Sequence, residues 1–159
     1  MQNKILSLLI CLFLVSACTK QLDDKIIEGN ENPEIGESPV IELLSMSATT
    51  IKAYSDTLTF KISYLDGDGD IGTDDPDVNS IELVDNRNAE QFVFGYHLSP
   101  RTPEGSNLII QGELDIVLNN SILLDDTNES EATTFSIRLK DRAGNWSNVL
   151  ETGEVTIEQ

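Results

Sequence analysis

The sequence predicts an all-β fold, in which about seven antiparallel strands form a sandwich over residues 39–159. Three observations lead to this prediction. Apolar residues alternate with polar ones, turn-forming residues interrupt these runs at short intervals, and no segment after residue 38 shows a convincing apolar helical stripe. A chain of this size can bury about two-thirds of its surface in a single core, so we expect one domain.

The clearest strand covers residues 57–64, where Leu58, Phe60, Ile62 and Tyr64 alternate with polar side chains. Such a period of two places one face of a strand on a core and the other face in water. The same pattern returns over residues 134–140. Shorter runs of the same kind contain Ile81 and Leu83, Phe92 and Phe94, Leu114 and Ile116, and Val155 and Ile157.

Turn signals separate these runs. They are Asp66-Gly67, Asp85-Asn86, Ser99-Pro100, residues 103–105, Asn119-Asn120 and residues 143–145. Residues 109–124 are ambiguous by themselves, because their apolar density suits a helix as well as strands. Gly112 and the pair Asn119-Asn120 favour strands, since both interrupt helices.

The N-terminal residues have the pattern of a lipoprotein signal peptide. Lys4 precedes an apolar run over residues 5–15, and the run closes on Val15-Ser16-Ala17-Cys18. It is shorter than the roughly 20 apolar residues that a membrane-spanning helix needs. We therefore expect removal of residues 1–17 and a covalent lipid on Cys18, which anchors the protein in a membrane. The alternative is an ordinary secretory signal cut after Ala17, which leaves Cys18 as a free thiol.

Residues 18–38 predict a lipidated N-terminus and a flexible acidic tether, because they contain glycine, asparagine and proline but too few apolar side chains for a core. A coil of this length averages roughly 25 Å from end to end.

The rest of the chain is also acidic. The full sequence has 10 Lys and Arg against 28 Asp and Glu, a net charge of −18, and loss of Lys4 leaves 9 against 28, about −19. Such a charge repels phosphate backbones, so we expect no nucleic-acid partner, and it favours cations, basic partners or simply solubility.

The most unusual segment runs from Asp66 to Asp77, where six carboxylates fall within twelve residues without a basic side chain. Calcium takes six to eight oxygen ligands, and alternating aspartates on a glycine-rich loop can converge on one ion. Asp66, Asp68 and Asp70 match the first ligand positions of an EF-hand loop, and Asp77 falls at its last. The match then fails, because Ile71 stands where that loop requires glycine and strands flank the segment.

A second acidic turn is expected to complete the site. If the strands before Asp66 and Asp141 are the second and the sixth of a sandwich, the loops after them emerge at the same end. We therefore predict a calcium site of Asp66, Asp68, Asp70, Asp77, Asp141 and Asn145. The alternative needs no metal: the glycines supply positive φ, the aspartates cap their own backbone, and Asp141 opens a turn with Gly144 as its left-handed partner.

Three segments together carry a family resemblance: VSAC at 15–18, YLDGDGDIG at 64–72 and IRLKDRAGNWSN at 137–148. They resemble small surface lipoproteins of Bacteroidota with an immunoglobulin-like β-sandwich. The last segment looks like the end of the penultimate strand, its turn and the start of the final strand of bacterial immunoglobulin-like domains. The resemblance implies an immunoglobulin-like fold, a lipid-anchored place on the periplasmic or the extracellular face of the outer membrane, and a non-catalytic role.

We expect no enzyme. The single histidine, His97, falls in a predicted strand opposite Phe92, Phe94 and Tyr96, so it is expected at the surface, and zinc lacks Cys and His ligands. The predicted function is a non-enzymatic module for binding or assembly, anchored to the membrane, with a protein or glycan partner. The alternative is a carbohydrate-binding accessory lipoprotein of a nutrient-uptake system. Trp146 is its candidate stacking residue, although a tryptophan in that position more often fills the core or the end of a sandwich.

Overall fold

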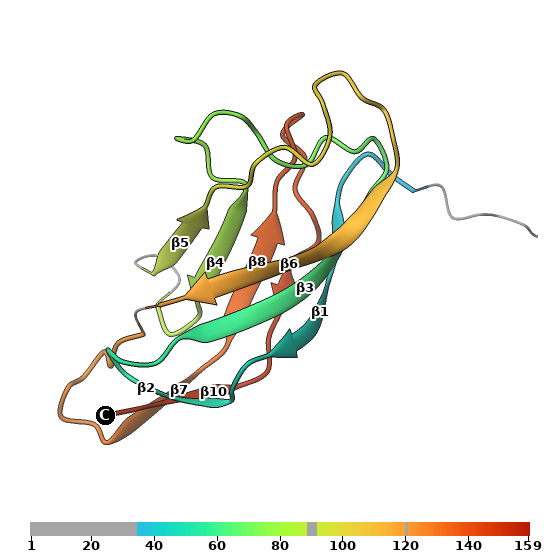
Figure 1. The fold of residues 1–159 in the computed structure, drawn as a ribbon. Coiled ribbons are helices and arrows are strands. Elements are labelled where there is room, and N and C mark those ends of the chain that lie inside the picture. Colours follow the sequence, from blue (N-terminus) through green and yellow to red (C-terminus); the bar gives the residue numbers. More distant parts are fainter. Residues whose placement is uncertain (1–34, 89–91, 120) are drawn as a thin grey trace, which may run out of the picture. The chain divides into compact units, whose positions relative to one another are not determined.

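A computed structural model describes residues 35–88, 92–119 and 121–159. The predicted signal peptide, Cys18 and most of the predicted tether lie outside these residues. Every regular element in the described ranges is a β-strand, so they contain no helix that could cross a membrane. Sheets pack against each other, which confirms the predicted all-β sandwich (Figure 1).

Ten strands are present in the described residues. In chain order they are β1 Val40–Met46, β2 Thr50–Lys52, β3 Leu58–Asp66, β4 Ile81–Asp85, β5 Val93–Tyr96, β6 Ile110–Leu118, β7 Ser130–Thr133, β8 Phe135–Leu139, β9 Leu150–Glu151 and β10 Val155–Glu158.

The strands form three sheets with the orders β1-β3-β6, β5-β4-β8-β9 and β2-β10-β7. Apart from the sheet β2-β10-β7, seven strands remain. The sheet β1-β3-β6 holds the first, second and fifth of these seven in chain order, and the sheet β5-β4-β8-β9 holds the other four. This division matches the two layers of an immunoglobulin-like sandwich. Two details differ from the prediction. The strands number ten rather than about seven, and β10 runs parallel to β2, so the sandwich is not wholly antiparallel.

The core contains buried residues of all three sheets. β3 alternates buried and half-buried residues along its whole length, and Phe60 on its inner face meets Phe135 of β8 edge to face, with ring centroids 5.2 Å apart. The buried apolar residues of the described chain lie between Ile41 and Ile157, and one compact unit spans Pro33–Gln159. This unit therefore contains a hydrophobic core of its own.

Residues 109–124 contain the strand β6, as Gly112 and the asparagine pair indicated. It pairs with β3 from Leu58↔Leu118 to Asp66↔Ile110. The last residue of β3, Asp66, thus lies at the end of the sandwich where β6 begins. Figure 1 shows the start of the described chain, the β3–β4 loop and the β5–β6 loop at this same end, opposite the C-terminus.

Candidate metal centre

Three aspartates from two distant segments meet at this end of the sandwich. Asp66, Asp70 and Asp141 each bring one carboxylate oxygen within 4.8 Å of the others. Asp66 continues the inward alternation of β3, and Asp141 follows β8 after a single residue. The predicted meeting of the loops after these two strands therefore holds for these three side chains.

Asp66 is the most unusual member of the group because it is fully buried, with an exposed fraction of 0%. Neither of its carboxylate oxygens has a hydrogen-bond partner among the described residues, and the same is true of Oδ1 of Asp68 and Oδ1 of Asp70. A buried carboxylate without donors is costly unless it is neutralised or coordinates a cation. The site therefore has several oxygen atoms free to bind a positive ion.

Burial and mutual repulsion also raise the pKa values of two of these carboxylates, Asp66 and Asp70. Burial raises the pKa of Asp66 to about 6, and repulsion by Asp68 and Asp70 adds to the rise. The nearby backbone N–H of Asp70 offsets part of the rise, although its geometry is not that of a hydrogen bond. Burial and repulsion by Asp141 raise the pKa of Asp70, while the Ala143 amide and the Arg142 guanidinium oppose that rise. Both carboxylates are ionised less readily than usual, which a divalent cation would reverse.

Main-chain hydrogen bonds hold the acidic loop in place. The Leu108 N–H donates to the Asp68 carbonyl at 3.2 Å, and the Arg142 N–H donates to the Asp70 carbonyl at 3.1 Å. The Thr102 hydroxyl donates to the Gly69 carbonyl. Because the backbone is fixed on several sides, the carboxylates cannot separate by a simple shift of the loop. The surrounding backbone therefore sets the positions of these carboxylates.

Asp141 combines the two roles that the sequence left open. Its Oδ1 accepts hydrogen bonds from the backbone N–H groups of Gly144 and Asn145, both at 2.7 Å, and Gly144 has a φ of 98°. The side-chain amide of Asn145 donates to Oδ2 of Asp141 at 2.9 Å. Asp141 thus opens the turn and also borders the acidic group. The structure places Asn145 as a hydrogen-bond donor to Asp141, not as a member of the carboxylate cluster.

The structure does not bring Asp77 to this group. Ile71 is fully buried and forms a bridge with Asp141, which fixes the chain just after Asp70. Asp77 lies beyond this point, is exposed, and donates its N–H to Oδ1 of Asp75 at 3.0 Å.

Asp68 remains next to the site through its buried Oδ1. Thr102 and Leu108, which hold the loop, were not identified from the sequence, because only long-range contacts place them there.

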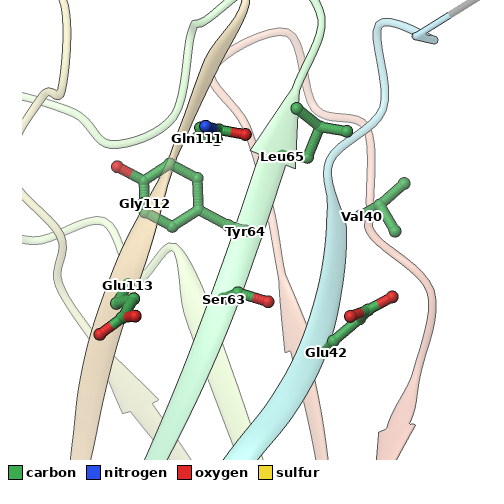
Figure 2. Close-up of a pocket in the computed structure, with 8 residues that line it drawn as sticks. All are labelled: Val40, Glu42, Ser63, Tyr64, Leu65, Gln111, Gly112 and Glu113. Carbon is green, nitrogen blue, oxygen red and sulfur yellow. The ribbon is translucent and has the colours of Figure 1, made fainter.

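A second feature is a surface hollow of about 440 Å³ over β1, β3 and β6 (Figure 2). Strand register aligns Glu42, Ser63 and Glu113 across the three strands. Lys61 lies 3.4 Å from Glu113 and 3.1 Å from Asp115, so it compensates charge on this face. The hollow therefore lies on a solvated sheet face where Lys61 forms ion pairs with Glu113 and Asp115, and we assign no binding or catalytic role to it.

The remaining candidates from the sequence lie at the surface. His97 is exposed, with its Nδ1 3.1 Å from the Val78 carbonyl oxygen. Trp146 does not fill the core, contrary to the usual behaviour expected for that position; it is partly exposed, and the Arg138 guanidinium lies 4.0 Å from its ring centroid. One face of the indole is therefore occupied by the guanidinium group.

Comparisons with known proteins add no family. No protein-family model matches the chain, and no curated protein matches it.

Proposed function

We propose that this chain is a non-enzymatic, lipid-anchored module for binding or assembly at the outer membrane, and that one calcium ion stabilises its domain. The observation that carries the calcium proposal is Asp66, a fully buried carboxylate without a hydrogen-bond donor, beside Asp70 and Asp141. A cation there would satisfy the unpaired oxygens and remove the repulsion among the carboxylates.

The chemistry of the site favours calcium over other ions. All candidate ligands are hard carboxylate oxygen atoms, which suit calcium, magnesium and manganese better than zinc or copper. Asp66, Asp68, Asp70 and Asp141 supply enough oxygens for an irregular shell that includes bidentate carboxylates, whereas magnesium requires a near-octahedral shell and usually keeps several waters. The ion would connect the β3–β4 loop to the turn after β8.

The anchoring part of the proposal rests on the VSAC sequence at 15–18, and the non-enzymatic part on the surroundings of the polar side chains. His97 is exposed and contacts a backbone carbonyl, and Glu113 is compensated by Lys61. Neither arrangement places a general base beside a nucleophile.

Calcium titration of the purified domain, residues 33–159, tests the proposal. We expect heat on titration and a higher melting temperature with calcium than with EDTA; at a hundredfold excess over Kd the gain is about 2.7 kcal/mol. Asp66→Asn removes the buried charge, so it should stabilise the calcium-free domain and abolish the calcium-induced shift.

Asp77→Asn is the matched control, because it is the same change in the same acidic segment but lies outside the cluster. It should retain the calcium response of the unmodified domain. An unmodified domain that melts at the same temperature with and without calcium, and gives no heat, would remove calcium from the proposal.

A further inference from the structure

The end of the domain with the candidate calcium site also exposes a pair of large aliphatic side chains. Leu108 and Ile109 have exposed fractions of 60% and 62%. They are the only two exposed large apolar residues that are adjacent in sequence within the described chain. Ile110 begins β6 and is half-buried, so the pair projects from the loop at the point where it enters the sheet.

This pair is fixed to the acidic loop rather than to a separate part of the domain. The N–H of Leu108 donates to the carbonyl of Asp68, and its own carbonyl oxygen lies 2.1 Å from the position that a Cβ on Gly69 would occupy. Only glycine, here with a φ of 73°, allows this approach. The positions of the two aliphatic side chains therefore depend on the position of the acidic loop.

The chain that leads to the predicted lipid anchor attaches at the same place. The carbonyl oxygens of Ile35 and Gly36 lie 2.6 and 2.3 Å from the position of a Cβ on Gly67, so the start of the described chain packs directly on the acidic loop. Residues 18–34 join this point to Cys18 and span at most roughly 60 Å. Of the two ends of the domain, this is the end that the anchor attaches to.

We propose that Leu108 and Ile109 enter the interface of a phospholipid surface when the calcium site is occupied. The inference rests on the proposed function for both the ion and the anchor. The chain has a net charge of −18, so its acidic end is repelled by anionic headgroups until a divalent cation reduces the local charge. Two side chains give weak contact, which the unanchored domain should show at millimolar lipid, and attachment to the same bilayer raises their effective concentration further.

Fluorescence with vesicles tests the contact. The domain of residues 33–159 contains no cysteine, so Ile109→Cys introduces a single site for an environment-sensitive label. With phosphatidylcholine vesicles containing phosphatidylglycerol, the label at residue 109 should move to an apolar environment in calcium but not in EDTA. A label on Leu124→Cys, an exposed apolar position near the C-terminus, is the matched control and should not respond.

Vesicle flotation of the double variant Leu108→Gln, Ile109→Gln provides the second measurement, because it removes the apolar side chains without adding charge beside the acidic loop. Calcium titration of each protein sets a saturating calcium concentration, and under that condition we expect at least tenfold less flotation than for the unmodified domain. Calcium binding without flotation or a spectral change would overturn the inference and leave the proposed function intact. Flotation that survives the double variant would also overturn it, whereas absence of calcium binding would defeat the proposed function itself.

Discussion

Two buried carboxylates of this domain have opposite environments. Asp66 lacks a donor, whereas Asp85 at the end of β4 is held by Arg87, whose side chain is only 9% exposed and lies 2.5 Å from Asp85 and 2.6 Å from Glu131. The Thr133 hydroxyl also donates to Asp85, at 2.6 Å. Here the protein supplies its own cation, and this ion pair joins β4 to β7.

Arg87→Ala should therefore be strongly destabilising. It leaves Asp85 buried without its counter-charge, and removal of one partner of a buried pair costs about 3–5 kcal/mol. Urea denaturation measures the loss. Lys61→Ala is the control, because Lys61 forms ion pairs in the exposed setting of the β3–β6 surface and its removal should be hard to distinguish from the unmodified domain. Equal losses for the two variants would show that the Arg87 cluster is not a buried structural pair.

The same cluster predicts a loss of stability in acid. The backbone N–H groups of Leu124 and Asp125, with Asn128 and Arg87, lower the pKa of Glu131 from 4.5 to about 2. Burial alone would raise the pKa of Asp85, but Arg87 and Thr133 outweigh it and hold that pKa below its ordinary value. Because both groups bind protons less tightly in the folded state, their stabilisation is complete above their unfolded-state pKa values and is lost as pH falls from about 4.5 toward 2.

Urea denaturation over this acidic range measures the effect, and Glu131→Gln should make the decline shallower. Asp66 contributes with the opposite sign at higher pH: its raised pKa means that the calcium-free domain loses stability as pH rises from about 4 to about 6. The loss of stability due to Glu131 should therefore be measured below about pH 4, where Asp66 in the folded domain no longer changes its protonation. An identical acid decline in Glu131→Gln would contradict the assignment.

At the scale of elements, regular alternation determined which strands could be recognised in the sequence. β3 and β8 keep an unbroken period of two, and both were predicted. β1 was not, because a register shift between Leu43 and Ser45 breaks its alternation. β7 and β9 are short and carry little pattern. Their pairing partners, rather than their own residues, make them strands.

The pairing of β3 with β6 depends on a glycine. Tyr64 lies opposite Gly112, and its ring occupies the space where a side chain at residue 112 would be (Figure 2). A Cβ on Gly112 would lie 2.6 Å from the Tyr64 hydroxyl oxygen. Gly112→Ala should therefore displace the tyrosine and destabilise the domain by about 1–3 kcal/mol.

Thermal or urea denaturation checks this prediction against Gly153→Ala. A Cβ at residue 153 meets only the end of Met46, at an ordinary 3.5 Å, so the control should unfold close to the unmodified domain. If Gly112→Ala is as stable as Gly153→Ala, the ring of Tyr64 has room to move and the contact does not constrain the sheet.

The acidic loop shows why spacing alone identified only part of the site. The spacing Asp66, Asp68, Asp70 pointed to the loop that supplies two of the three clustered aspartates, and an EF-hand comparison extended it to Asp77. A hydrophobic residue, Ile71, interrupts this extension because it is pulled into the core and pairs with Asp141. The chain after Ile71 thus runs away from the cluster, and Asp141 takes the place that local spacing had given to Asp77.

At the scale of the whole molecule, the proposed location depends on one thiol. Cys18→Ser should abolish incorporation of labelled palmitate and move the protein from the membrane fraction to the soluble fraction, because two or more acyl chains are needed for stable anchoring. Fractionation and metabolic labelling of cells that express the full chain measure both effects. Ala17→Ser, a change between small residues beside the same thiol, is the control and should leave the protein acylated.

The sequence by itself determined the fold class, the predicted anchor and the acidic loop, because each is written in local patterns: a period of two, an apolar run before a cysteine, and alternating aspartates. Only the tertiary structure decided that Asp66 is buried without a donor, that Asp141 joins it and that Asp77 does not. Burial and convergence depend on how β3, β6 and β8 pair, and those contacts join residues far apart in the chain. The same long-range packing places Leu108 and Ile109 beside the acidic loop, where no local pattern could have located them.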